Sequence, residues 1–212
     1  MDETSCNSEG AAILAASPYL TRLTELHLSA NNLGDAGVRA LADAPGLARL
    51  QTLYLNQNRI GDSGARALAR SAHLSELREL HLWKNRIGVK GARYLAASSN
   101  LVRLRELVLD ENTIGDEGTL ALASSPYLTR LRRLCLEDNS IGVVGASALA
   151  ASPYLERLFE LDLAKNIIQT QGVLALAEST ALPSLELLSI FAGHVEDSVL
   201  AALRQRYREV KT

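Results

Sequence analysis

Three side chains that could bind a metal ion or act as a nucleophile stand at equal intervals along the chain. The spacing from His27 to His81 equals the spacing from His81 to Cys135, and Asp162 follows Cys135 at half that spacing. Zinc binding requires several imidazole or thiolate groups around one ion, and a cysteine nucleophile requires a base within hydrogen-bond reach. Zinc binding or nucleophilic catalysis is therefore possible only if the fold brings side chains at these spacings close together.

Pairs of carboxylates are separated by the shorter interval, the one from Cys135 to Asp162. It separates Asp110 from Glu137, and it also separates Glu111 from Asp138. If one interval brings such residues side by side, the paired carboxylates can bind calcium or raise each other's pKa.

The shorter interval is the period of a repeat that spans nearly the whole chain. Successive units read L-x-x-L-x-L-x-x-N-x-[IL], and the asparagine of this frame recurs at Asn31, Asn58, Asn85, Asn112, Asn139 and Asn166. Units of this length bury their apolar side by stacking on their neighbours, so the array forms one continuous core. We expect a half repeat that caps the array at residues 1–19, six 27-residue repeats at 20–181, and a degenerate seventh repeat with a C-terminal capping helix at 182–212.

Each unit is predicted to contain a strand followed by a short helix. Leucines alternate with variable residues in the first half, as in Leu26-His27-Leu28, and small residues surround one leucine in the second half. Parallel strands are spaced ~4.8 Å apart, whereas packed helices are about 8 to 10 Å apart. The stack must therefore bend into a horseshoe, with a concave parallel sheet inside and the helices outside.

Polar side chains are expected to hold the turns and helix starts. Each asparagine of the frame can bond the turn backbone of its own unit and of the adjacent unit, because an unpaired buried amide costs about 1 to 3 kcal/mol. Asp35, Asp62 and Asp116 stand where they would cap the starts of their own helices. Val89, Val143 and Thr170 replace them in other units, so those helix starts are expected to be weaker.

The residues from Leu50 to Ala69 carry a family resemblance. This segment resembles the ribonuclease-inhibitor-like class of leucine-rich repeats, which includes the GTPase-activating proteins for Ran. The resemblance implies an α/β fold, a right-handed solenoid with a concave parallel sheet, and non-enzymatic protein binding. It also offers an alternative function, the regulation of a small GTPase. The S-P-Y-L sequences at 17–20, 125–128 and 152–155 are similar to repeats of bacterial leucine-rich proteins. A third interpretation is a recognition arm of a longer effector.

The predicted geometry argues against catalysis and metal binding. His27 and His81 would lie two strands apart, about 10 Å, which is too far to share one zinc ion. Cys135 is equally distant from His81, and the carboxylate pairs lie on an open sheet that does not exclude water. We therefore predict a chain that is not an enzyme, with no catalytic residue, metal site or cofactor.

The variable strand positions are instead predicted to bind a partner protein. Side chains between the leucines should face the hollow of the horseshoe. There the only tryptophan, Trp83, lies near Tyr54, which is typical of an interface anchor. The second half is rich in carboxylates, which are either a solvated face or a surface for a partner with a basic patch. The predicted partner-binding residues are His27, Tyr54, His81, Trp83, Lys84, Asp110, Glu111, Glu137, Asp138 and Asp162.

Composition and charge argue against binding to nucleic acid or to a membrane. The net charge of −2 provides no basic field for nucleic acid, and no run approaches the ~20 apolar residues of a membrane span. The polar N-terminus and the presence of only two cysteines favour a cytoplasmic protein. We expect a monomer. Arginines cluster where the helices return to the strands, at Arg103, Arg105, Arg130, Arg132, Arg133 and Arg157. We expect them to solvate the sheet edge and to pair with Glu106, Glu156 and Glu160. No aromatic stacking is interleaved with them, which argues against a nucleic-acid site.

Overall fold

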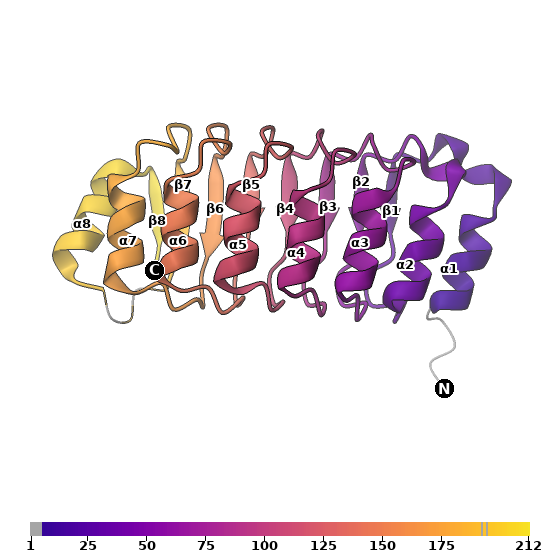
Figure 1. Ribbon diagram of the computed structural model, residues 1–212, viewed down its shortest axis with the longest axis horizontal. Coiled ribbons are helices and arrows are strands. Elements are labelled where there is room, and N and C mark those ends of the chain that lie inside the picture. The colour runs from indigo at the N-terminus through magenta and orange to yellow at the C-terminus, as the bar shows by residue number, and fades with distance from the viewer. Residues whose placement is uncertain (1–5, 192, 194) are drawn as a thin grey trace.

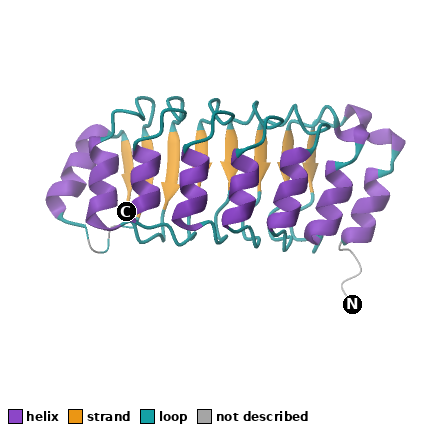
Figure 2. Ribbon diagram, viewed as in Figure 1, coloured by secondary structure: helices purple, strands orange, loops and turns teal. Residues whose placement is uncertain are grey.

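The computed structural model describes residues 6–191, 193 and 195–212, and these form a single array of strands and helices. One row of helices lies in front of one row of strands, and α1 and α8 lie at opposite ends (Figure 1). Loops connect the two rows at both edges (Figure 2). The predicted α/β solenoid with a parallel sheet is therefore confirmed. Residues 1–5 of the predicted half repeat at 1–19 lie outside the described residues.

The strands are short and occur once per unit. They are β1 (Glu25–His27), β2 (Thr52–Tyr54), β3 (Glu79–His81), β4 (Glu106–Val108), β5 (Arg133–Cys135), β6 (Glu160–Leu163), β7 (Leu187–Ile190) and β8 (Glu209–Lys211). Their order in the sheet is their order in the chain, and every pair is parallel. From β1 to β7 the register equals the repeat, so that Glu25 pairs with Thr52 and Thr52 pairs with Glu79. Residues at the same place in the frame therefore lie side by side.

The helices cover one face of this sheet. They are α1 (Ser8–Ala15), α2 (Gly34–Ala42), α3 (Asp62–Arg70), α4 (Val89–Ala96), α5 (Gly115–Ala123), α6 (Val143–Ala150), α7 (Gln169–Glu178) and α8 (Asp197–Arg206), with 3-10 turns at Pro18–Arg22 and Pro45–Leu47. The leucines of the frame are buried between the two rows, as at Leu53 and Leu80. We use the name concave face for the side of the sheet that points away from the helices.

β8 is an element that the repeat pattern does not predict. It follows α8 and pairs with β7, and Leu187 lies opposite Glu209, which is a shorter offset than the repeat. Tyr207, between α8 and β8, is buried and donates its hydroxyl to the carbonyl of Leu176 at 2.6 Å. The C-terminal segment therefore contributes a strand as well as the expected helix.

The asparagine ladder is confirmed. In Asn166, Oδ1 accepts the amides of Asn139 and Ile141, each at 3.0 Å, and Nδ2 donates to the carbonyl of Leu136 at 2.7 Å. Nδ2 also lies 3.2 Å from the carbonyl oxygen of Ala164, in its own unit. Each such side chain thus joins two consecutive turns.

A second buried ladder was not predicted. A serine after each of the helices α3 to α7 donates its hydroxyl to a carbonyl at the end of the preceding unit's helix, as Ser98 does to Ala69 at 2.6 Å. The same hydroxyl accepts the amide of Asn100 at 3.3 Å. The ladder runs through Ser71, Ser98, Ser125, Ser152 and Ser179. It therefore links the ends of α2 to α6 to the following units.

The aspartates cap helices, but not their own. Asp62 lies in α3, and its Oδ1 accepts the amides of Gly88 and Gly91 at the start of α4, both at 2.8 Å. Asp35 and Asp116 act in the same way on α3 and α6. The expected weak starts at Val89 and Val143 were therefore wrong, because the preceding unit supplies their cap.

Helices that receive no capping carboxylate from the preceding unit begin with a different backbone conformation. α5 and α7 follow the units in which Val89 and Val143 replace aspartate. There Gly115 has φ +60° and Gln169 has φ +52°, whereas the capped Gly88 is extended at φ −102°. The amide of Gly115 donates instead to the carbonyl of Asn139 at 2.9 Å. The aspartate of one unit thus correlates with the backbone conformation of the next.

Replacing Asp62 by alanine is expected to lower the free energy of unfolding by about 1 kcal/mol, the usual cost of losing a helix cap. Faster hydrogen exchange should appear at the amides of Gly88 and Gly91, in the next unit. Asp62→Asn keeps an acceptor oxygen and should lose much less stability. Exchange that increased only at the start of α3 would contradict capping between units.

Candidate functional site

A stack of three aromatic rings lies on the concave face. His27 and Tyr54 have ring centroids 4.2 Å apart with an interplanar angle of 18°, and Tyr54 and His81 are 4.3 Å apart at 23°. These residues are register partners on β1, β2 and β3, so the sheet itself sets their spacing. The tyrosine ring separates the two imidazoles, as expected from their positions two strands apart.

The same column continues on this side of the sheet but becomes buried further along it. Val108 is 8% exposed and Cys135 is 3% exposed. Burial, reinforced by the charge of Asp110, raises the pKa of the Cys135 thiol to about 12. Cys135 is therefore a thiol at neutral pH and is not an activated nucleophile.

Trp83 lies outside the leucine core and is half-buried. Its backbone amide donates to Asn56 Oδ1 at 2.9 Å, and Lys84 Nζ lies 5.7 Å from the centre of its ring. The residue follows β3 by two positions, so it belongs to the turn after the strand rather than to the strand itself. A tryptophan held in this way presents a rigid, partly apolar surface.

Asp110 and Asp162 are carboxylates whose burial disfavours their charge. Burial raises the pKa of Asp110 to about 6, although its carboxylate accepts the amide of Glu137 at 2.7 Å. Burial also raises the pKa of Asp162, while its bond from the amide of Ala164 opposes the shift. Asp110, Asp162 and Glu137 repel one another as well. The repulsion from Glu137 raises both pKa values more than the attraction of Arg133 lowers them.

Three of the predicted binding residues stand in left-handed turns. Lys84, Glu111 and Asp138 have φ values of +54°, +49° and +51°. Lys84 Nζ lies 3.8 Å from Glu111 Oε2, and Lys165 Nζ lies 2.6 Å from Glu137 Oε1. The three residues thus follow the strands at the rim of the sheet, where Lys84 and Glu111 form an ion pair with each other.

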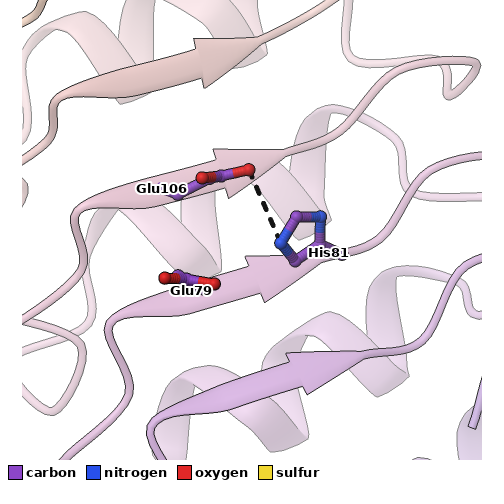
Figure 3. Close-up of side chains that lie close together, drawn as sticks. All are labelled: Glu79, His81 and Glu106. Carbon is purple, nitrogen blue, oxygen red and sulfur yellow. Dashed lines mark ion pairs between the residues drawn. The ribbon is translucent and has the colours of Figure 1, made fainter. Parts of the chain in front are cut away.

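A further column of charged residues lies at the start of the strands, and its member Glu79 was not predicted. Glu79 and Glu106 are register partners on β3 and β4, and Arg133 follows on β5. Arg133 Nη1 donates to Glu106 Oε1 at 2.8 Å, and its Nε lies 3.2 Å from Glu160 Oε1. Residues two positions apart on a strand point to the same face, so Glu79 could have been identified from its spacing to His81. Figure 3 shows Glu79 and Glu106 beside the His81 ring.

The arginine-rich edge agrees with the expectation at Arg133. The predicted pairing with Glu106 and Glu160 is confirmed for this residue. Phe159 lies at the same edge. With Arg132 and Arg157 it lines a cavity of about 520 Å³.

No helix among the residues that the structure describes has the length and apolar character needed to cross a membrane.

Comparisons with known proteins give a family and two similar structures. Five segments match the family described as "Leucine Rich repeat", at residues 19–42, 49–69, 73–96, 104–123 and 127–150. An internalin from Listeria monocytogenes aligns with a TM-score of 0.54 and 23% identity, over 91% of this chain and 62% of that one. This chain thus spans about three fifths of the internalin. No match was found among curated proteins.

The second structure is the tropomodulin C-terminal domain of Caenorhabditis elegans, with a TM-score of 0.54 and 18% identity over 71% of this chain and 92% of that one. At such low identities, both structures support the fold alone.

Proposed function

We propose that this chain, which belongs to the leucine-rich repeat family, binds a partner protein through its concave face. Leucine-rich repeats generally mediate interactions between proteins and are typically not enzymes. The finer proposal is that Trp83 anchors the contact and that the carboxylates beyond it meet a basic patch of the partner. Lys84, Glu111 and Asp138 would form the rim of this contact.

The observation that carries this proposal is that aromatic side chains share the concave face with Asp110 and Asp162, whose charge is disfavoured by burial. Asp110 has a pKa raised to about 6 by burial, a cost that the isolated chain bears without an ion pair among the described residues. A lysine or arginine of a partner would stabilise the charged form. The rigid array keeps these side chains in register, so little conformational entropy is lost on binding.

Regulation of a small GTPase would be a special case of this binding. Measuring nucleotide hydrolysis by candidate GTPases with and without the chain separates the two functions, since acceleration would identify a regulator. We also propose that the chain acts as a monomer in the cytoplasm. Its cysteines, Cys6 and Cys135, are both free, as is usual in a reducing compartment.

Replacing Trp83 by alanine is expected to weaken partner capture about tenfold while leaving the melting temperature nearly unchanged, because a half-buried anchor contributes more to binding than to folding. Capture from the source lysate, quantified against protein concentration, measures the effect. Val144→Ala is the matched control, because Val144 is 60% exposed and lies on a helix of the opposite face. Equal capture by the Trp83 variant and the native chain would reject the proposed site.

A further inference from the structure

We propose that Glu79, His81 and Glu106 form a binding site for a divalent transition-metal ion of the zinc type on the concave face. One ligand atom of each residue lies within 4.8 Å of the other two. Glu79 and Glu106 are partners on adjacent strands, and His81 is two positions beyond Glu79 and so on the same side of the sheet. Figure 3 shows the His81 ring directed toward Glu106. This inference is independent of the proposed partner binding.

An unsatisfied nitrogen points to a ligand at this place. His81 Nε2 is buried and makes no hydrogen bond, although it lies 3.5 Å from Glu106 Oε1. This nitrogen therefore lacks a hydrogen-bond partner among the described residues, and it lies beside the two carboxylate groups. An imidazole nitrogen and carboxylate oxygens are common ligands of zinc.

The separation of the donor atoms fits a shared ion. With metal–ligand bonds of about 2.0 to 2.2 Å, donors 3.5 Å apart subtend an angle of about 115° at the metal. This value is close to that of a tetrahedral site. The third donor, from Glu79, lies within 4.8 Å of the other two and would have to approach by side-chain rotation, because two donors on one ion are at most about 4.4 Å apart.

Neighbouring side chains hold each ligand in place. Tyr54 stacks on the His81 ring at 4.3 Å. Thr52 Oγ1 donates to Glu79 Oε2 at 3.4 Å, and Arg133 donates to Glu106 at 2.8 Å. Such outer contacts orient the ligands of metal sites. Arg133 also faces Glu160, so the local group of three carboxylates and one guanidinium keeps a net negative charge, which attracts a divalent cation.

The donor set selects the class of ion. One imidazole and two carboxylates suit zinc and related transition metals, whereas calcium takes six to eight oxygen ligands. Three protein ligands leave at least one position open for water or for a group brought by another molecule. The open position would face the hollow of the sheet.

Titration of the metal-stripped chain with zinc chloride tests the site, using calorimetry and the fluorescence of Trp83. Trp83 is the only tryptophan and stands two positions after His81, so its emission should change on binding. We expect one ion per chain, and an affinity at least about tenfold lower in His81→Gln and in Glu106→Gln. Cobalt(II) should give visible absorption bands in the native chain and lose them in both variants.

The pair His27 and Glu25 provides the matched control. His27 Nε2 lies 2.6 Å from Glu25 Oε1 in the same columns, but the neighbouring strand offers Thr52 in place of a second carboxylate. His27→Gln should therefore bind zinc as tightly as the native chain. Circular dichroism establishes that each variant is folded. No binding by the native chain at about 1 mM zinc, or unchanged affinity in folded His81→Gln and Glu106→Gln, would overturn the proposal.

Discussion

Replacing Asn166 by alanine is expected to lower the free energy of unfolding by about 3 to 5 kcal/mol, more than a typical point mutation. Its side chain is 1% exposed, so water cannot replace the lost partners. The change leaves the amides of Asn139 and Ile141 and the carbonyl of Leu136 without the bonds that join two units. Each such unpaired buried group costs about 1 to 3 kcal/mol, and partial relaxation reduces the sum.

Urea unfolding followed by circular dichroism measures this loss, and hydrogen exchange locates it. Asn100→Ala is the control, because Asn100 lies outside the asparagine column and only its backbone amide takes part in the serine ladder. Exchange should increase at the amides of Asn139 and Ile141, in the unit before the substitution. A loss below about 1 kcal/mol would mean that the ladder contributes little beyond an ordinary hydrogen bond.

The fold could be predicted because the same frame recurs in every unit and specifies the same structure each time. The frame residues from Leu23 onward specify strand positions, register and the buried side of every unit, and adjacent units impose the same register on each other. The asparagine ladder followed from the same regularity, since a polar residue at a buried place must bond the backbone around it. β8 could not be predicted in this way, because its offset from β7 is shorter than the repeat.

Contacts between units were harder to predict than positions within a unit. The capping aspartates were assigned correctly as caps but to the wrong helix, because sequence spacing does not reveal how far neighbouring helices are staggered. In the structure Asp62 reaches the start of α4 rather than that of α3. The burial of Val108 and Cys135 likewise depends on side chains from adjacent strands, which no single unit specifies.

The candidate site was predicted in part. Trp83 and Tyr54 lie outside the leucine core, as expected, because alternation along a strand separates its two faces. The group of Glu79, His81 and Glu106 was not predicted, because spacings of one or two repeats reveal residues at the same place in the frame, and His81 differs in place from the two glutamates. Glu79 and His81 share β3, whereas Glu106 lies opposite Glu79 on β4.

Replacing Asp110 by asparagine is expected to stabilise the isolated chain by about 2 kcal/mol near pH 7.5, raising the melting temperature by roughly 4 to 8 °C. Burial raises the pKa of Asp110 from 3.8 to about 6, so the folded state binds the proton more tightly than the unfolded state does. Native stability therefore falls as pH rises between these values. Asparagine cannot ionise, yet it keeps an oxygen that can accept the amide of Glu137.

The advantage of Asp110→Asn should vanish near pH 4, where Asp110 is protonated in the native fold, and should be complete above about pH 7. Melting curves of both proteins across this range measure the difference.

The same variant should capture the partner about tenfold less well, because a carboxylate retained at a cost to stability is typical of a functional site. Greater stability with undiminished capture would place the basic contact elsewhere on the concave face, whereas an unchanged melting temperature at pH values above 7 would mean that Asp110 is a solvated carboxylate.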